Sequence, residues 1–174
     1  TKLSHIHFTT NGQARNRVLA MGEERWRVAD VGFPGLDGLA SNDFESEELV
    51  LKFLDFSSKA PIVLFTQHSI TTEPDKAQKQ IQQSLSALEK LILNGVQVVA
   101  TYPNNDWGGE DIVDALLEFN SKRYSGFRLI PSLGRRRYHG LLNLARNKNY
   151  KIVCVGNSSS GLKETPAFGC PTVN

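Results

Sequence analysis

The segment PIVLFTQ, residues 61–67, is a short apolar run of β-branched and aromatic residues without polar alternation. A run of this kind is typical of a strand that is covered on both faces, as in a parallel sheet wrapped by helices. Three later runs share its character: VQVVATY (96–102), FRLIP (127–131) and KIVCVG (151–156). Since segments of helical period separate the four runs, we predict an α/β fold with one parallel sheet and helices on both faces.

The clearest helix is predicted between the first two of these strands, where apolar residues recur at spacings of three and four. We expect Thr72 to be its N-cap, Pro74 to lie in its first turn and Gly95 to follow its last residue. Shorter helices are predicted around residues 111–120 and 136–146. One apolar stripe of the long helix is expected to pack on the sheet: Ala77, Ile81, Leu85, Leu88 and Ile92.

The N-terminal part of the chain shows the same alternation on a smaller scale. HIHFTT (5–10) and RVADVGFP (27–34) read as two strands around a helix near residues 13–21. The turn-rich segment GFPGLDG (32–38) then interrupts the pattern. A domain boundary is therefore predicted near residues 35–45.

We assign residues 1–40 to the end of an N-terminal domain together with a crossing segment, and residues 41–174 to a C-terminal domain. The chain opens on TKLSHIHF, the close of one element running into a strand, and stops on PTVN, a strand barely begun. We therefore expect it to be a piece of a longer protein, with its second domain truncated at the end.

Composition indicates a globular protein and gives no sign of binding to nucleic acid or to a membrane surface. The 174 residues are 40% hydrophobic and carry a formal net charge of +2, so neither nucleic acid nor a membrane surface is an expected partner. The densest basic run, residues 135–137, is expected to be the solvated start of a helix, with His139 beside it at the surface. No stretch approaches the roughly 20 apolar residues of a membrane span, and the first residues lack the features of a signal peptide. The cytoplasm is the expected compartment.

The cysteines and the N-terminal histidines do not indicate a metal site. Cys154 and Cys170 are expected to be buried free thiols. His5 and His7 alternate onto one face of a predicted strand, but no Cys, Asp or Glu lies close by in the sequence to complete a set of ligands. We therefore expect no bound metal.

Polar residues follow each predicted strand of the sheet. The carboxyl ends of parallel strands share one edge, and ligands of open α/β sheets collect outside it. We expect the following residues to lie together there: Gln67, His68, Ser69, Thr71 and Thr72, then residues 103–106, Ser132, and residues 157–161.

The loop GNSSSG, residues 156–161, has two interpretations. Backbone N–H groups and hydroxyls at the start of a helix suit a phosphate or diphosphate, whereas Asn157 and the serines could instead only cap that helix. Glu164 is similarly open, because its carboxylate suits the two hydroxyls of a ribose but also fits a capping box by spacing. His68 is either a structural histidine or a hydrogen-bond donor or proton carrier facing an anionic ligand.

Four motifs in order resemble those of UDP-N-acetylglucosamine 2-epimerases of the hydrolysing type, which act in sialic-acid biosynthesis. They are HSITTE (68–73), YPNNDWGG (102–109), IPSLGRRRYHGLL (130–142) and GNSSSGLKETPAFGCPTVN (156–174). TKLSHIHFTT and VGFPGLD also resemble the segment that joins the two halves of that enzyme. Non-hydrolysing epimerases carry an arginine-rich sequence after the corresponding histidine, where this chain has Ser-Ile-Thr-Thr.

The resemblance implies two Rossmann-like domains, as in glycosyltransferases of the B type, with a UDP-sugar in the cleft between them. This chain would supply the end of the first domain and most of the second. His68 is the implied catalytic residue and would approach the diphosphate. The implied substrate-binding residues are Gly32 near the nucleotide at the interdomain crossing, Asn104 and the Ile130 backbone along the nucleotide, Ser158 and Ser159 at phosphate and sugar, and Glu164 at the ribose.

The family reaction eliminates UDP across C1 and C2 to give a glycal, and water then adds to release N-acetylmannosamine. By the resemblance, the carboxylates that act at C2 belong to the first domain, upstream of Thr1, so this chain alone is expected to be inactive. No cofactor, metal or nicotinamide, is implied. A glycosyltransferase of the same fold and a non-catalytic nucleotide-binding module remain alternatives, and assembly into a homo-oligomer is left open.

Overall fold

A computed structural model describes residues 2–174 of the chain. The chain divides into two compact units, Thr1–Asp43 and Phe44–Asn174. The predicted assignment of these units to two domains of a longer enzyme stays a prediction. Among the described residues, no helix has the length and apolar character needed to cross a membrane.

The first unit is a small parallel β-α-β arrangement, as predicted. Strands β1 (His7–Thr9) and β2 (Val28–Asp30) pair in parallel, with His7 opposite Val28. They flank helix α1 (Gly12–Ala20), where the Asn11 side chain accepts a hydrogen bond from the Ala14 amide at 2.8 Å. Short helical turns follow, in elements η1 (Arg25–Arg27), η2 (Pro34–Leu36) and α2 (Asp37–Ala40).

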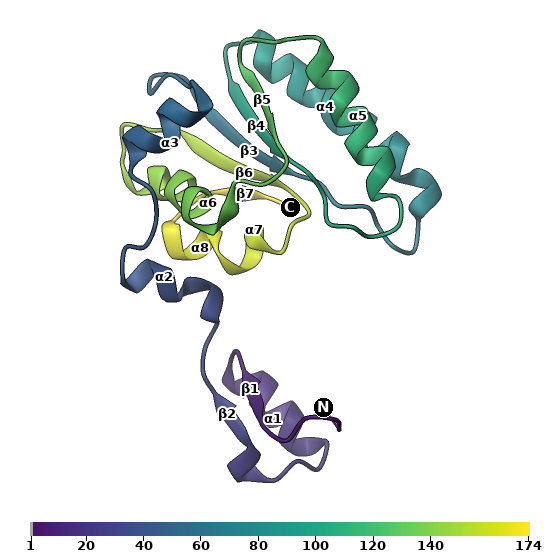
Figure 1. The fold of residues 1–174 in the computed structure, drawn as a ribbon, viewed down its shortest axis with the longest axis vertical. Helices are drawn as coiled ribbons and strands as arrows, with labels where there is room; N and C mark the ends of the chain where they lie inside the picture. Colours follow the sequence, from purple (N-terminus) through teal and green to yellow (C-terminus); the bar gives the residue numbers. More distant parts are fainter. Residues whose placement is uncertain (1) are drawn as a thin grey trace. The chain divides into compact units, whose positions relative to one another are not determined.

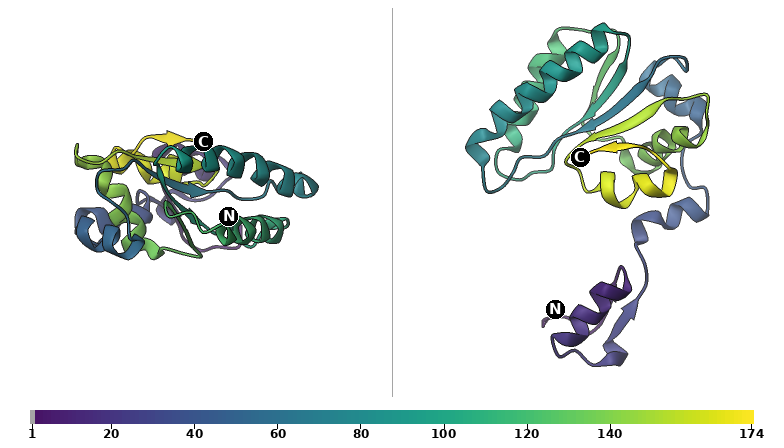
Figure 2. Two further views of the ribbon diagram at one scale, coloured as in Figure 1. Left: turned by 90° about the horizontal axis from the view of Figure 1, so that it is seen from above. Right: turned by 180° about the vertical axis from the view of Figure 1, so that it is seen from behind.

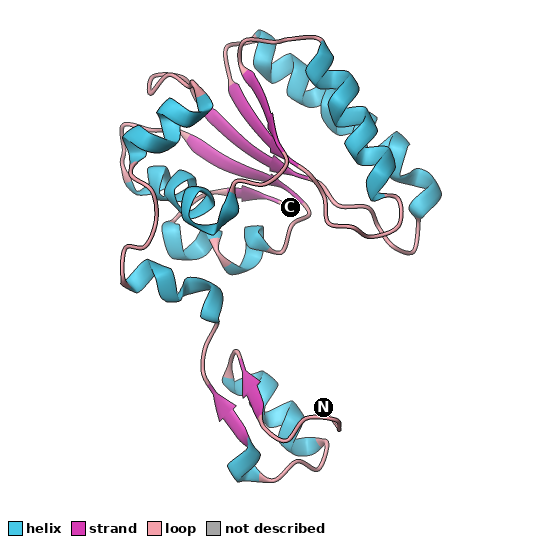
Figure 3. Ribbon diagram, viewed as in Figure 1, coloured by secondary structure: helices cyan, strands magenta, loops and turns pink. Residues whose placement is uncertain are grey.

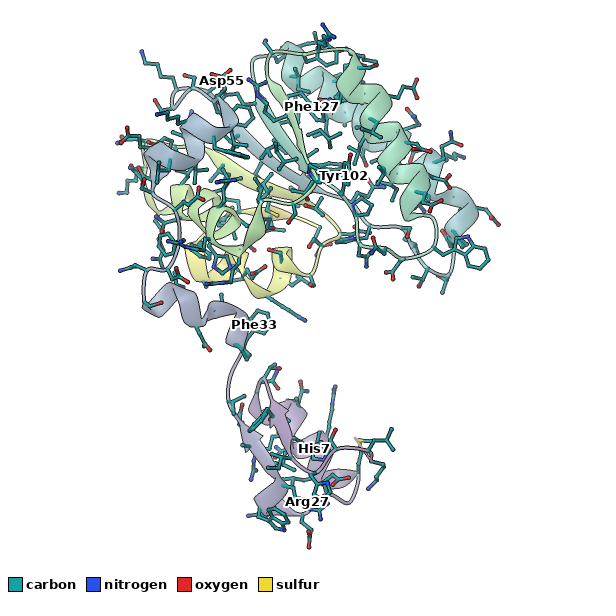
Figure 4. All side chains as sticks on the ribbon, viewed as in Figure 1. His7, Arg27, Phe33, Asp55, Tyr102 and Phe127 are labelled. Carbon is teal, nitrogen blue, oxygen red and sulfur yellow. The ribbon has the colours of Figure 1, made fainter. Side chains whose placement is uncertain are left out.

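His7 is buried in this unit (Figure 4) and has an acidic neighbour. Its Nε2 lies 3.3 Å from a carboxylate oxygen of Glu23. The expectation that no carboxylate lies near the two histidines is therefore wrong, because the fold brings Glu23 back to β1. Within residues 2–174, no group of three or more His, Cys, Asp or Glu side chains is arranged to hold a metal ion.

The second unit contains a five-stranded sheet in which all strands are parallel, which confirms the predicted fold class (Figure 3). The strand order is β5-β4-β3-β6-β7. The bounds are β3 (Ile62–Thr66), β4 (Gln97–Thr101), β5 (Phe127–Ile130), β6 (Ile152–Gly156) and β7 (Thr172–Val173). The chain thus starts in the middle of the sheet, builds outward to β5 and returns to the other side of β3.

Helices cover both faces of this sheet (Figures 1 and 2). One side carries α4 (Ala77–Leu93) and α5 (Gly109–Ser121). The other side carries α3 (Glu47–Leu54), α6 (Gly134–Asn143), α7 (Ser160–Lys163) and α8 (Thr165–Phe168). The 3-10 turns η3 (Pro74–Lys76) and η4 (Leu144–Arg146) precede α4 and follow α6.

The apolar stripe of α4 packs on the sheet as predicted. All five expected residues are buried in one cluster with Val63 and Phe65 of β3 and Val98 and Ala100 of β4. Gly95 follows the helix in the left-handed region, with φ of 83°. Thr72 is not the N-cap, because the segment after it forms the 3-10 turn at Pro74–Lys76 and α4 begins at Ala77 without a side-chain cap.

The start of α6 is solvated at Arg135 and Arg136, as predicted, but Arg137 is partly buried. Arg137 makes a two-pronged ion pair with Glu45, at 2.8 and 2.9 Å, and its guanidinium lies 3.6 Å from the centre of the Phe53 ring. At Gly140, a Cβ atom would lie 2.5 Å from the Glu45 carbonyl oxygen. The close approach to the Glu45 backbone and to α3 turns residues 139–142 inward. His139 is therefore completely buried, and the expectation that it lies at the surface is wrong.

The tightest backbone approach in the sheet concerns Gly156, which pairs with Thr66 at the end of β6. Its φ is 130°, and a Cβ atom there would overlap the Thr66 carbonyl. We expect Gly156→Ala to lower the free energy of unfolding by about 3 kcal/mol or more, through backbone strain and the displacement of β3. Guanidinium unfolding followed by circular dichroism measures this loss.

Gly95→Ala is the matched control. This glycine also has positive φ, but no atom lies within 4 Å of the position of an added Cβ. It should therefore cost only about 1 kcal/mol, the penalty of a left-handed conformation. Equal losses in the two variants would show that the contact with Thr66 does not constrain the sheet.

Candidate functional site

A cavity of about 330 Å³ lies at the carboxyl ends of β3, β4, β5 and β6. This is the edge at which open parallel sheets bind their ligands. Its lining consists of Thr66, His68, Thr101, Tyr102, Pro131, Ser132, Leu133, Gly134, Arg135, Tyr138, Ser158 and Glu164. Residues from four strand ends and from α6 therefore meet at one place, as the alternation of strands and helices predicts.

The Asn157 side chain ties the loop after β6 to the loop after β3. Its Oδ1 accepts a hydrogen bond from the His68 amide at 2.6 Å, and its Nδ2 donates to the His68 carbonyl at 2.9 Å. The amide thus continues the parallel pairing of β3 with β6 by one step beyond the last strand residues. These two hydrogen bonds keep His68 in a defined position beside the GNSSSG loop.

The His68 ring is oriented by a second backbone contact. Its Nδ1 accepts a hydrogen bond from the Asn104 amide at 3.0 Å. Because a backbone N–H can only donate, Nδ1 carries no proton here and the neutral ring has its proton on Nε2. His68 therefore offers one hydrogen-bond donor, at Nε2.

Asn104 itself lines a neighbouring cavity of about 650 Å³, formed by the loop after β4 and the first residues of α5. Its side-chain amide donates to Asp106 at 2.6 Å. The structure thus connects Asn104 to His68 through the backbone, while its side chain belongs to the second cavity.

The GNSSSG loop combines backbone and hydroxyl groups. The Ser158 Oγ accepts a hydrogen bond from the Ser160 amide at 3.3 Å, which is a local contact of the capping kind. Ser159 precedes the short helix α7 and makes no side-chain cap bond. The buried Ser160 hydroxyl has no hydrogen-bond partner among the described residues. Ser158 can still donate its own hydroxyl proton, so its local contact does not exclude a ligand.

Glu164 lies where α7 ends and α8 begins, and it makes no side-chain cap bond. A capping box is therefore not its role in this structure. Its Oε1 lies instead 2.8 Å from Nε2 of the buried His139. Glu164 also lines the cavity, so its carboxylate contacts His139 and is still accessible to a ligand.

The start of α6 forms another wall of the cavity. The Ser132 Oγ accepts from the Gly134 amide at 3.2 Å, and Gly134 takes a positive φ of 65° that suits the sharp entry into the helix. The first turn of α6 contains no acidic residue, and Arg135 lines the cavity. The helix dipole and this arginine both favour an anion here.

The lining also includes the hydroxyl groups of Thr66, Thr101 and Tyr138. Burial, and secondarily the Cys154 thiol, raises the pKa of Tyr138, so its phenol stays protonated near neutral pH. The Thr66 and Thr101 hydroxyls share a hydrogen bond of 2.5 Å. The site therefore offers hydroxyl groups, one carboxylate, and the basic side chain of Arg135 at the start of α6.

Apart from Asn104, which lines the neighbouring cavity, the predicted site residues fall into three groups. His68, Ser158 and Glu164 line one cavity. Ile130 pairs with Thr101 at the end of β5, directly before the lining begins, and Ser159 continues the GNSSSG loop. Gly32 belongs to the first unit, where its positive φ of 76° suits glycine.

Other residues of the site were not predicted, namely Thr66, Tyr138 and His139. Tyr138 falls within the helix predicted around residues 136–146, and its local sequence does not mark it as a site residue. A signal for the inward side of α6 existed in Gly140, because a glycine inside a helix often marks a close packing contact.

The chain is similar to known proteins over its whole length. The family model described as UDP-N-acetylglucosamine 2-epimerase matches residues 1–174. The chain is 35% identical to the UDP-N-acetylglucosamine 2-epimerase of Neisseria meningitidis serogroup B, covering 100% of this chain and 43% of that protein. It is 29% identical to a GDP/UDP-N,N'-diacetylbacillosamine 2-epimerase (hydrolyzing) of Campylobacter jejuni, with the same coverage.

Solved structures share the fold. The co-structure of Staphylococcus aureus MnaA with UDP gives a TM-score of 0.65 at 17% identity, over 98% of this chain and 42% of that one. The UDP-N-acetylglucosamine 2-epimerase of Rickettsia bellii gives a TM-score of 0.61 at 15% identity, over 99% and 42%. The chain thus spans less than half the length of these relatives. Because the family model matches all of it, the chain belongs to the UDP-N-acetylglucosamine 2-epimerase family.

Proposed function

We propose that the chain is part of a hydrolysing 2-epimerase, which converts UDP-N-acetylglucosamine and water to N-acetylmannosamine and UDP. The observation that carries this proposal is the cavity at the carboxyl edge of the sheet, where His68, Ser158 and Glu164 meet. Relatives from Campylobacter jejuni and Legionella pneumophila are named as hydrolyzing 2-epimerases, which supports the hydrolysing reaction. Another relative is named a polysialic acid biosynthesis protein, which supports a role in making a sialic-acid precursor.

The cavity suits a nucleoside diphosphate in its distribution of charge. The diphosphate would lie between the start of α6, with Arg135, and the hydroxyls of Ser158 and Ser159. The ribose hydroxyls would donate to the Glu164 carboxylate. The Ile130 backbone and Asn104 are proposed to line the nucleotide, and Gly32 is proposed to contribute to its binding in the complete enzyme.

The proposed chemistry has two steps. A base removes the proton from C2, the bond from C1 to the phosphate oxygen breaks, and UDP leaves with the electron pair of that bond. Water then adds across the new C1–C2 double bond, placing the hydroxyl on C1 and a proton on C2 from the opposite face. Both steps need a positioned proton carrier and stabilisation of the charge that develops on the diphosphate.

His68 is proposed to stabilise the leaving diphosphate. Its Nε2–H is the donor that remains once Nδ1 accepts from Asn104. A donor fixed before the reaction begins gains strength as the phosphate oxygen becomes more negative. Asn157 and the Asn104 amide hold His68 for this purpose, so the imidazole need not reorganise during bond breaking.

Removing one contact to the nucleotide should weaken UDP binding. Ser158→Ala and Glu164→Ala in the full-length enzyme should each cost about 1.5 to 3 kcal/mol, the range for hydrogen bonds to charged groups. This corresponds to a loss of about 10- to 150-fold in UDP affinity by titration calorimetry. If Ser158 only caps the helix through Ser160, its variant should instead lose about 1 kcal/mol of stability and keep its affinity.

Replacing His68 should affect turnover more than substrate binding. We expect His68→Ala to lower kcat on the order of 100-fold with a smaller change in KM, because the contact strengthens in the transition state. His68→Gln should recover part of kcat if Nε2 acts only as a donor. His5→Ala, a change at an exposed histidine of the first unit, is the control. A kcat for His68→Ala within threefold of the wild type would remove His68 from the reaction.

Residues 1–174 alone should not turn over UDP-N-acetylglucosamine. Arg135, His68 and Glu164 are proposed to contact the nucleotide. The base that acts at C2 is expected from the other domain of the complete enzyme. UDP release from the purified chain, measured with a coupled assay, should stay at the level of a protein-free blank. Steady release above the blank would place the base within these residues.

A further inference from the structure

His139 is an unusual residue for its position. It lies on α6, is completely buried and packs against the Phe168 ring at a centroid distance of 5.2 Å. Its neighbours Leu141 and Leu142 on the same helix are also completely buried. An apolar side chain would fill such a site without leaving polar atoms to be satisfied, so the imidazole needs a specific reason.

One ring nitrogen has a partner and the other has none. Nε2 lies 2.8 Å from Glu164 Oε1, whereas Nδ1 is buried without a hydrogen-bond partner among the described residues. An ionised carboxylate can only accept, so the proton of this bond is on Nε2. Nδ1 is thus a buried polar atom whose hydrogen-bonding capacity is not used.

Glu164 depends on this contact for its orientation. It lies at the junction of two four-residue helices, α7 and α8, and its carboxylate makes no cap bond to either. Its side chain is 22% exposed at the cavity. A glutamate on such short elements has several accessible rotamers, and fixing one of them before a ligand arrives removes part of the ordering cost of binding.

We propose that His139 is a positioning residue, which holds the Glu164 carboxylate ready to accept the hydroxyls of the ribose. This inference rests on the proposed function, in which Glu164 binds the ribose. His139 is expected to act only through Glu164, because its ring is buried behind the carboxylate and does not line the cavity. It also links α6 to the α7–α8 junction, and so connects two walls of the site.

Substitutions of His139 separate the donor from the packing. His139→Leu and His139→Met keep an apolar volume and remove the donor, His139→Gln places an amide donor near the position of Nε2, and His139→Asn places one near Nδ1. Calorimetric titration of the full-length enzyme with UDP should show a loss of about 5- to 30-fold for the two apolar variants, as expected when one hydrogen bond to a charged group is removed. His139→Gln should recover most of this loss and His139→Asn little of it.

The ligand can be varied in the same way. Inorganic pyrophosphate lacks the ribose, so its affinity should change less than twofold in His139→Leu. The preference for UDP over 2′-deoxy-UDP should shrink toward one. The melting temperature of His139→Leu should be unchanged or higher, because the variant removes a buried Nδ1 without a partner. A role in packing alone predicts the reverse, a lower melting temperature with unchanged UDP affinity, and that result would overturn the proposal.

A double variant tests whether His139 acts through Glu164. In the Glu164→Ala background, His139→Leu should cause no further loss of UDP affinity, whereas additive losses would overturn the inference. The two proposals fail in different ways. Unchanged affinity in Glu164→Ala would contradict the ribose contact itself, while a clear loss in Glu164→Ala with none in His139→Leu and His139→Met would contradict only the positioning role.

Discussion

The site depends on the pairing of β3 with β6. These strands are separated by most of the second unit in sequence, yet they lie side by side because the chain leaves β5 and returns across the sheet. Gly156 permits the closest approach, at Thr66, and Asn157 then brackets the His68 backbone. Without this pairing, the histidine and the serine loop would follow strands at unrelated places, and the cavity between them would not exist.

The groups around the cavity differ in how they are supported. His68 is held by the Asn157 side chain and the Asn104 backbone amide from two neighbouring loops, so its position follows from the sheet. Glu164 is on short helical segments and is held by one buried side chain from α6. Helix α6 is in turn fixed through Arg137 and Gly140 to the segment at Glu45. The position of His68 thus depends on the sheet, and the position of Glu164 depends on packing between helices.

Much of the fold could be predicted from the sequence, because strands that are buried on both faces, such as β3 and β4, and a long amphipathic helix leave strong local patterns. The common edge followed from the parallel topology. Two predictions were wrong. Thr72 is not the N-cap because a 3-10 turn precedes α4, and His139, which follows three arginines closely, is buried rather than exposed. The inward side of α6 is decided by the backbone at Glu45, far away in sequence, and no local pattern contains that information. The partner of Glu164 was missed for the same reason.

The reactivity of the two cysteines can be used to measure local opening of strands β6 and β7, at one edge of the sheet. Cys154 lies in β6 and Cys170 lies two residues before β7, and both are buried free thiols. Burial raises the pKa of Cys154, and it raises that of Cys170 to about 11, so neither thiol forms the reactive thiolate readily while the strands stay paired. Alkylation by a thiol reagent therefore requires local opening of β6 and β7. The alkylation rate then reports how often these strands open. Since β6 leads directly into the serine loop, the same labelling would register whether a bound nucleotide holds that edge closed.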